Sequence, residues 1–294
     1  LFAAKIEISI MSQFLTAYLI LYTMNKQLLF VIVIYNLDFH QSSTYQTLLL
    51  PHSDIPTYII DNSLYSQIVQ DSNVIFYSHH PDNPGVSFAY NEAAKYAKEN
   101  GYEWMLLLDQ DTHFPNGILQ EYLDCIRSRP DIHLIAPPVN VSNGRYMSPV
   151  KLWWKMGLIN NNVPKGQIIS LYDYSPINSG MCISVDAFFK CGGYKNQVFL
   201  DYSDFQFIER FRRISDKGYI LKTEIHQEFS TLVDDRDKML SRYQLFCLSL
   251  KQCDMPSFVD RMGYAMVVLK RGVSLILKTH SFRPVLIFFK YYIK

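Results

Sequence analysis

Two carboxylates stand one residue apart at the end of an apolar run. Residues 104–108 read Trp-Met-Leu-Leu-Leu and are followed by Asp109, Gln110 and Asp111. A short apolar run of this kind predicts a buried strand, and residues i and i+2 of an extended chain point to the same side. Asp109 and Asp111 are therefore expected to project together from a strand end. Such a pair of carboxylates suits a hard divalent cation, Mg²⁺ or Mn²⁺, and that cation can grip a diphosphate.

The elements that must position these carboxylates alternate between strand and helix. Strands are predicted at 28–35, 56–60, 74–77, 104–108, 133–136 and 181–185, and helices at 42–50, 86–100, 116–127 and 204–213. This alternation predicts an α/β fold with a mostly parallel central sheet flanked by helices and right-handed crossovers. In such sheets ligands bind beyond the carboxyl ends of the strands. Asp61, the turn at 83–85 and the Asp109–Asp111 pair all follow strands, so they are expected at one sheet edge.

Composition sets the class of protein. The chain has 294 residues, of which 49% are hydrophobic and 19% are charged, which excludes a disordered chain. This length can bury a sizeable core in one large domain or two small ones. The cysteines are odd in number and lack the spacing of a metal site, so they are expected to be free thiols in a reducing compartment. They are Cys125, Cys182, Cys191, Cys247 and Cys253.

The end of the chain is basic. No acidic residue follows Asp260, but seven basic residues do, so residues 1–260 carry −6 of a total net charge of +1. A mildly acidic body with a basic, apolar tail argues against nucleic acid as a partner and favours peripheral contact with an anionic membrane. The alternative is that the amphipathic stretch at 263–294, expected to break at Pro284, packs on the rest of the chain.

Three regions are expected along the chain. Residues 1–23 form a leader whose nature is left open: the apolar run at 14–22 is too short to span a bilayer and no small-residue cleavage site follows it. Residues 24–235 are expected to form the catalytic domain, with 142–172 as a long, partly mobile loop region. Residues 236–294 are expected to form a helical, membrane-associating region.

An ordered set of short motifs runs through roughly two thirds of the chain, from residue 28 to residue 226. In order they are Tyr35-Asn36, Asp61-Asn62-Ser63, Asn83-Pro84-Gly85 with Asn91 and Ala94, Leu108-Asp109-Gln110-Asp111-Thr112, Asn178-Ser179-Gly180, Gly192-Gly193-Tyr194, and Asp201-Tyr202-Ser203-Asp204 with Arg210. Together they resemble family 2 glycosyltransferases of the GT-A fold. The Asp109–Thr112 form of the DXD motif most resembles the bacterial rhamnosyltransferase branch, which acts in cell-surface polysaccharide synthesis.

The resemblance implies how a nucleoside-diphosphate sugar, linked to dTDP or UDP, is held. Asp61 is expected to contact the nucleotide base. Asp109 is expected to contact ribose and metal, and Asp111 the metal–diphosphate. His226, after a later strand, is expected to help hold metal or phosphate. The remaining donor-contact positions are Tyr35, Asn83, Gly85 and Asn91.

The resemblance also implies a catalytic base and an acceptor site. Asp204, which opens the predicted helix at 204–213, would take the proton of the acceptor hydroxyl, with Asp201 as its rival. A single displacement of this kind inverts the anomeric centre. The acceptor, a glycan or a lipid-linked glycan, would meet Asn178, Ser179 and Gly180. The family's Arg-Tyr…Arg-Asn signature is incomplete here, because Arg242-Tyr243 has no Arg-Asn after it, which leaves the acceptor end of the site open.

Plainer interpretations stand beside these roles. Asp204 at a helix start is also typical of an N-cap, and Asp61 before Asn62 and Ser63 is typical of an Asx turn. Asn83-Pro84-Gly85 can be only a turn, and a lone His226 is commonly structural.

The sequence is compatible with three classes of protein. The leading hypothesis is a metal-dependent transferase at the cytoplasmic face of the plasma membrane. A sugar-nucleotide pyrophosphorylase would carry a Gly-rich loop with Arg and Lys after the first strand, where this chain reads Tyr-Asn-Leu-Asp at 35–38. A membrane-bound scaffold with a decayed site would not require Asp61, Asp109, Asp111 and Asp204.

Overall fold

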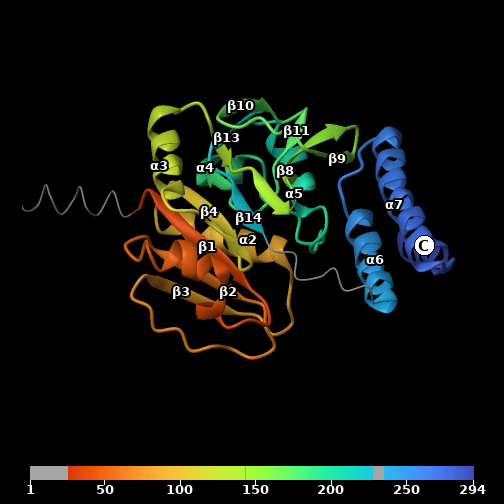
Figure 1. Cartoon of the computed structure of the whole chain (residues 1–294), viewed down its shortest axis with the longest axis horizontal. Helices are drawn as coiled ribbons and strands as arrows, with labels where there is room; N and C mark the ends of the chain where they lie inside the picture. Colours follow the sequence, from red (N-terminus) through yellow and green to blue (C-terminus); the bar gives the residue numbers. More distant parts are fainter. Residues whose placement is uncertain (1–25, 143, 228–234) are drawn as a thin grey trace, which may run out of the picture.

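The computed structural model describes residues 26–142, 144–227 and 235–294 (Figure 1). The predicted leader at 1–23 lies outside the described residues. The described chain folds as a mixed α/β protein around a large central sheet with helices on both faces, which confirms the predicted fold class. The strands of this sheet are β1 (Leu28–Ile34), β2 (Thr57–Asp61), β3 (Val74–His79), β4 (Trp104–Asp109), β6 (Leu134–Ala136), β10 (Gln167–Ser170), β12 (Cys182–Ser184) and β13 (Lys217–Ile220).

The central sheet runs in the order β10-β13-β6-β12-β4-β1-β2-β3. The strands β4, β1, β2 and β3 are all parallel neighbours, whereas β12 is antiparallel to both β4 and β6. Every residue of β1 is buried because the sheet is covered on both faces. This explains why its sequence is a continuous apolar run rather than an alternating one.

Helices cover the two faces of this sheet and define two cores. The first core joins one face of β1 and β4 to α2 (Val86–Glu99), α4 (Val185–Lys190) and α5 (Ser203–Phe211). The second joins the opposite face to η2 (Tyr45–Leu49) and α3 (Ile118–Ser128), beside the short turn η1 (Phe39–Gln41). Helix α2 approaches the sheet closely because Ala89, Ala93, Ala94 and Ala97 lie on its buried face.

A second, smaller sheet corrects the predicted loop at 142–172. Within that range the chain forms β10 of the central sheet and two strands of the second sheet, β8 (Arg145–Trp153) and β9 (Met156–Asn160). In the second sheet, β8 pairs with β7 (Val139–Ser142), β9 and β11 (Tyr174–Ser175). The sheet is completed by β5 (Thr112–His113) and β14 (Ile225–Gln227). The prediction was wrong because these strands are partly exposed, so polar residues, glycine and Pro149 interrupt the apolar pattern that identifies a buried strand.

The end of the chain forms a helical layer, which lies next to the second sheet near β9 (Figure 1). It comprises α6 (Arg236–Lys251), α7 (Phe258–Thr279), α8 (Arg283–Ile287) and η3 (Phe288–Ile293). The predicted break at Pro284 is displaced: α7 ends at Thr279, His280 is left-handed, and Pro284 lies in the first turn of α8, where a missing N–H costs nothing. Tyr264 and Val268 of α7 are fully buried, so this helix packs on the protein.

A second face of α7 stays exposed. Val259, Met262, Met266, Leu269 and Val273 recur at spacings of three and four residues, and each is exposed. This spacing places them in one stripe along the helix. Among the described residues, no helix is both long enough and apolar enough to cross a bilayer.

Candidate active site

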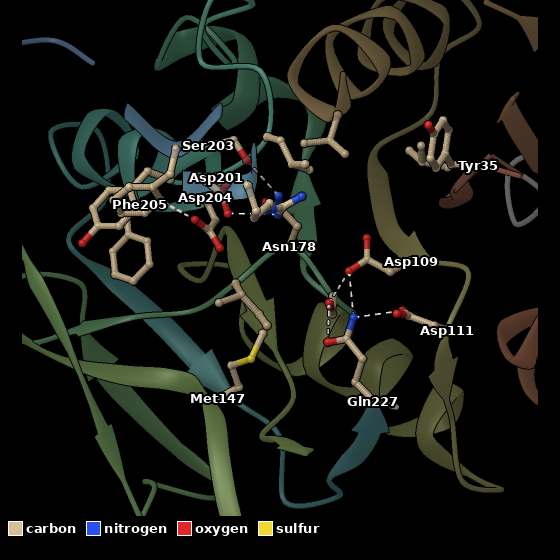
Figure 2. Close-up of a pocket in the computed structure, with 18 of the residues that line it drawn as sticks. Tyr35, Asp109, Asp111, Met147, Asn178, Asp201, Ser203, Asp204, Phe205 and Gln227 are labelled. Carbon is tan, nitrogen blue, oxygen red and sulfur yellow. Dashed lines mark hydrogen bonds and ion pairs between the residues drawn. The ribbon is translucent and has the colours of Figure 1, made fainter. Parts of the chain in front are cut away.

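A pocket of ≈ 520 Å³ opens at the carboxyl ends of β1 and β4. Figure 2 shows Asp109, Asp111 and Gln227 on one side of it and Asp201, Ser203 and Asp204 on the other, with Asn178 between them. The two sides come from distant parts of the chain. The end of β4 and the residues after it supply Asp109 and Asp111, β14 supplies Gln227, and the start of α5 with the residues before it supplies the second side. Residues of the helical layer also line the pocket, namely Arg242, Phe246 and Arg271.

Strand register decides which predicted donor contacts reach this pocket. Asp61 pairs with Ile34 across β1, and Asp109 pairs with Val33 on the other side of β1. Because Val33 and Ile34 are successive residues, the two aspartates point to opposite faces of the sheet. Asp109 lines the pocket together with Tyr35, whereas Asp61 does not.

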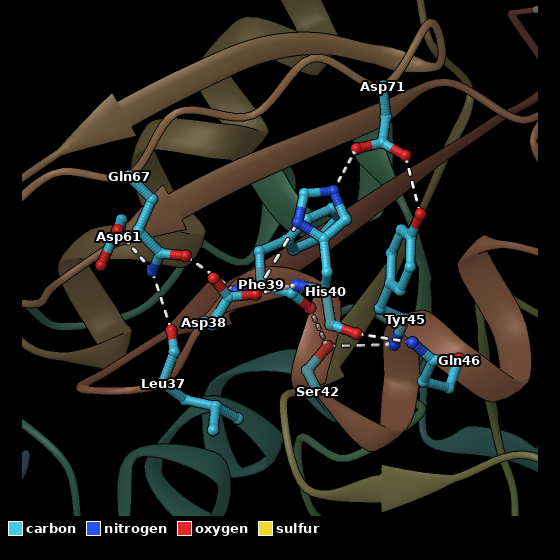
Figure 3. A network of polar contacts seen from close by, with 10 residues as sticks. All are labelled: Leu37, Asp38, Phe39, His40, Ser42, Tyr45, Gln46, Asp61, Gln67 and Asp71. Carbon is cyan, nitrogen blue, oxygen red and sulfur yellow. Dashed lines mark hydrogen bonds and ion pairs between the residues drawn. The ribbon is translucent and has the colours of Figure 1, made fainter.

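Asp61 lies in a polar network on the opposite face (Figure 3). Its Oδ1 accepts a hydrogen bond from the Ser63 N–H at 2.9 Å, and its Oδ2 accepts from Tyr77 Oη at 2.7 Å and Gln67 Nε2 at 3.0 Å. The side chain is fully buried. The bond from the Ser63 N–H is the contact of an Asx turn, which is the plainer interpretation of Asp61. Both carboxylate oxygens are therefore already hydrogen-bonded within the protein.

Asp109 is held by three side chains. Ser179 Oγ donates to its Oδ2, Gln227 Nε2 lies 3.4 Å from the same oxygen, and Tyr90 Oη lies 3.3 Å from Oδ1. Burial and the neighbouring Asp111 carboxylate raise the pKa of Asp109 above its usual value. Its oxygens are thus largely engaged within the protein, and a nearby cation would favour its charged form.

Asp111 leaves more of its carboxylate open to the pocket. Gln227 Nε2 donates to Asp111 Oδ1 at 2.9 Å and so bridges the two aspartates. No cluster of three His, Cys, Asp or Glu side chains able to hold a metal occurs among the described residues. Two carboxylates on a pocket wall still fit Mg²⁺ or Mn²⁺, because such ions commonly take one or two protein carboxylates and complete their coordination with substrate phosphates and water.

The opposite wall holds the two candidate bases. Asp204 lies in the first turn of α5, and its Oδ1 accepts from the Phe205 N–H at 2.8 Å. Burial, with Asp201 and Asp109 nearby, raises the pKa of Asp204 to about 7. Asp201 Oδ1 instead accepts from Arg242 Nη2 at 3.0 Å, so its charge is partnered. A carboxyl group that titrates near neutrality suits proton transfer better than one paired with arginine.

A strained residue fixes the start of α5 between these aspartates. Tyr202 has φ 68°, in the left-handed region that a non-glycine residue seldom adopts. Its ring stacks on Phe205 at 4.6 Å between centroids, and its hydroxyl donates to the Lys155 carbonyl at 3.0 Å. These contacts offset the strain at a position two residues before Asp204, which lines the pocket.

The predicted acceptor segment lies at the pocket floor. Asn178 Oδ1 accepts from Tyr194 Oη at 2.6 Å and Asn178 Nδ2 donates to Ser203 Oγ at 3.3 Å. Ser179 also lines the pocket and holds Asp109. Gly180 does not line the pocket, and its carbonyl accepts from Tyr122 Oη at 2.5 Å. Asn178 therefore connects the Asp204 wall to the core, and Ser179 connects to the Asp109 wall.

Besides Asp61, three more of the predicted donor contacts lie outside the pocket lining. Asn83, with φ 46°, turns the chain toward α2, and Gly85 adopts φ 90° at its N-cap. A Cβ on Gly85 would lie 2.3 Å from the Phe199 carbonyl oxygen, so this position admits only glycine without rearrangement. Asn91 ties α2 to the loop at 194–196: its Oδ1 accepts from the Tyr194 N–H at 2.9 Å.

His226 is not brought to the pocket. It lies in β14 between Ile225 and Gln227, and its side chain is 54% exposed and paired across the strands with His113. Since side chains alternate along a strand, Gln227 faces the aspartates and His226 faces away. Gln227 was not predicted as a site residue, because the sequence does not show which side chains of a three-residue strand point toward the pocket.

Arg242 and Arg271 were also missed as site residues. They lie 29 positions apart on α6 and α7, so only the packing of these helices brings both to one wall. The one sequence signal was the incomplete Arg242-Tyr243 motif.

Comparison with known proteins gives distant structural likenesses, two of which follow. No family model matches the sequence, and no curated protein matches it. Among solved structures, S. aureus TarS 1–349 is 13% identical, with 84% of this chain and 72% of that chain covered and a TM-score of 0.47. The mannosyltransferase PcManGT from Pyrobaculum calidifontis, solved with GDP-Man and Mn²⁺, is 8% identical, with 86% and 73% covered and a TM-score of 0.48.

Proposed function

We propose that this protein is a metal-dependent glycosyltransferase of the GT-A type, which moves a sugar from a nucleoside diphosphate to a hydroxyl group. The observation that carries the proposal is the pairing of two walls in one pocket. Asp109 and Asp111 can grip a cation on one wall, and Asp204, with a pKa of about 7, faces them from the other. A leaving group held at one wall and a base at the other is what displacement at an anomeric carbon requires.

The protein's own residues support the two halves of this reaction. A divalent cation, when bound, stabilises the negative charge that grows on the departing diphosphate. Ser179 and Gln227 hold Asp109 and Asp111 on one wall of the pocket, where they would hold the cation that binds the diphosphate. Asp204 takes the proton of the acceptor hydroxyl as its oxygen bonds to the anomeric carbon. The products are the glycosylated acceptor and the nucleoside diphosphate, and the proton ends on Asp204.

The finer features of the proposal rest on the motif order in the sequence. They are a dTDP- or UDP-linked donor, rhamnose as the favoured sugar, inversion at the anomeric centre, and a glycan or lipid-linked acceptor in cell-surface polysaccharide synthesis. A cytoplasmic site at the inner face of the plasma membrane follows from the same set. Inversion also suits the geometry, since a single base on the far wall serves one direct displacement.

Product analysis tests this function. The protein is incubated with Mn²⁺ and a panel of UDP-, dTDP- and GDP-linked sugars, and phosphorus NMR follows the nucleotide. We expect one donor class to release nucleoside diphosphate, slowly with water as the acceptor. A sugar-nucleotide pyrophosphorylase would instead need added pyrophosphate and would form nucleoside triphosphate and sugar 1-phosphate. A non-catalytic scaffold would leave every donor intact, and either outcome would overturn the proposal.

We also propose that α7 meets an anionic membrane surface. Its exposed stripe, from Val259 to Val273, is apolar, and the seven basic residues after Asp260 have no acidic residue among them. Pairing of this stripe with a second copy would bring like charges together, whereas anionic lipid adds about 1 kcal/mol per nearby Lys or Arg. Packing of one face of α7 on the protein leaves the other face available for this contact.

Flotation with anionic and neutral liposomes tests the membrane proposal. We expect wild-type protein to float with anionic vesicles at low salt and to be released at high salt. The double variant Met262→Glu, Leu269→Glu should lose flotation. Ile214→Glu, an exposed apolar residue away from the stripe, is the matched control and should float as wild type does. Equal binding of the stripe variant, or no binding by wild type, would contradict the proposal.

A further inference from the structure

The helical layer contributes two guanidinium groups to the pocket, and one carboxylate serves both. Arg242 of α6 donates to Asp201 Oδ1 at 3.0 Å, and Arg271 Nη1 of α7 lies 3.9 Å from the same oxygen. Arg271 also stacks on Phe246, with its Cζ 4.1 Å from the ring centroid. The stacking holds the Arg271 guanidinium plane in place while its N–H groups remain free to bind a ligand.

The charges of Arg242, Arg271 and Asp201, which together form one corner of the pocket, do not balance. Two permanent positive charges face one carboxylate, because arginine stays protonated in proteins. No hydrogen bond from the Arg271 side chain to another described residue is found, and its one ion pair there is the contact with Asp201 Oδ1 at 3.9 Å. Burial disfavours the Arg271 charge and lowers its pKa, which a nearby anion would reverse. The corner is thus built to receive a further anionic group.

We propose that Arg242 and Arg271 form an anion subsite for a phosphate group on the acceptor. The proposal rests on the glycosyltransferase function above and names the acceptor class for that site. The phosphate belongs to the acceptor rather than to the donor, because the subsite adjoins Asp201 and Asp204, whereas the donor diphosphate is assigned to Asp109 and Asp111 on the opposite wall (Figure 2). Planar guanidinium groups bind phosphate through paired hydrogen bonds.

Two sources can present this phosphate, a lipid-linked diphosphate or a phosphodiester within a polymer. Isothermal titration distinguishes them with farnesyl diphosphate and glycerophosphoglycerol as probes and with farnesol and glycerol as their uncharged controls. Titrations are run with and without saturating nucleoside diphosphate and Mn²⁺. We expect one phosphate probe to bind, its uncharged control not to bind, and the affinity to persist when the donor site is filled.

Variants locate the binding. Arg271→Gln and Arg242→Gln should each weaken the bound probe about tenfold or more, as loss of a charge-assisted hydrogen bond does. Arg271→Lys keeps the charge but not the planar fork and should lose less than Arg271→Gln. Asp201→Asn removes the competing carboxylate and should tighten binding. Arg213→Gln, an exposed arginine outside the pocket, is the matched control and should bind as wild type does.

The outcomes separate this inference from the function on which it rests. Loss of probe binding on filling the donor site, or unchanged affinity in both arginine variants, would overturn the acceptor subsite. Weaker binding in Asp201→Asn would do the same, because a merely structural role for the cluster predicts that sign. Absence of any Mn²⁺-dependent nucleoside diphosphate binding would count against the glycosyltransferase proposal instead, whatever the phosphate probes show.

Discussion

Replacing Asp204 by asparagine is expected to abolish sugar transfer while leaving donor binding unchanged. The amide keeps the shape of the side chain but cannot accept the proton of the acceptor hydroxyl. Loss of a general base typically costs about 10²–10⁴-fold in rate. Turnover is measured by release of nucleoside diphosphate, and donor affinity by titration calorimetry in the presence of Mn²⁺.

Asp204 also predicts how rate and stability depend on pH. With a pKa of about 7, the carboxylate form grows as pH rises through 7, so kcat/KM of wild type should rise over this range and then level. Stability should move the other way. The folded pKa lies above the unfolded value, so the stabilising contribution is present below pH 4 and is lost as pH rises through 7. At pH 8, Asp204→Asn should therefore have a higher Tm than wild type.

The matched control for this variant is Asp216→Asn, an exposed aspartate away from the pocket. It should retain the turnover of wild type, and at pH 8 it should have the Tm of wild type. Near-normal transfer by Asp204→Asn would sink the assignment of the base. If Asp201→Asn lost transfer and Asp204→Asn kept it, the base would be Asp201, whose carboxylate contacts Arg242 and Arg271.

The second large effect is expected for Asp111→Asn. This change removes the carboxylate that is most open to a cation, so Mn²⁺-dependent binding of nucleoside diphosphate should disappear. The rate should fall by about 10²–10³-fold, because a metal contributes several kcal/mol to stabilising charge in the transition state. Thermal unfolding with nucleotide, with and without Mn²⁺, reports the binding, since a ligand that binds only the folded state raises Tm.

Asp131→Asn serves as the control for this experiment, because Asp131 is exposed and lies far from the pocket in the fold. Its Mn²⁺-dependent shift should equal that of wild type. An undiminished shift in Asp111→Asn would show that the cation is held elsewhere. The folded state of the variant is checked by its Tm in the absence of ligand.

The sequence predicted the buried parts of the fold well and the exposed parts poorly. β1 and β4 are covered on both faces, so their apolar runs identify them within one residue at either end. The bounds of helix α2 were predicted equally well, from the alanines on its buried face and from Asn100-Gly101 at its C-terminal end. By contrast, the strands β8 and β9 carry one exposed face and polar interruptions, and the short strand β14 is three residues long. Their pairing depends on contacts between distant segments, which local patterns do not encode.

The site divides along the same line. Asp109, Asp111 and Asp204 could be found because each follows directly from a strand end or a helix start. Asp61 could be placed at the right sheet edge, but its facing follows from the register of β1 with β2, which no local pattern gives. Gln227, Arg242 and Arg271 reach the pocket only through tertiary packing, and their own sequence surroundings are ordinary. The roles of the site residues remain predictions that the variants above address.

The proposed transfer breaks the bond between the anomeric carbon and the diphosphate oxygen. The most direct measurement is hydrolysis of the active donor in water enriched in oxygen-18, with wild-type protein, Mn²⁺ and mass spectrometry of both products. Attack at the anomeric carbon predicts the label in the released sugar and none in the nucleoside diphosphate, with neither product formed by Asp204→Asn. Label in a phosphate group, or no donor consumed by wild-type protein, would rule out a glycosyltransferase.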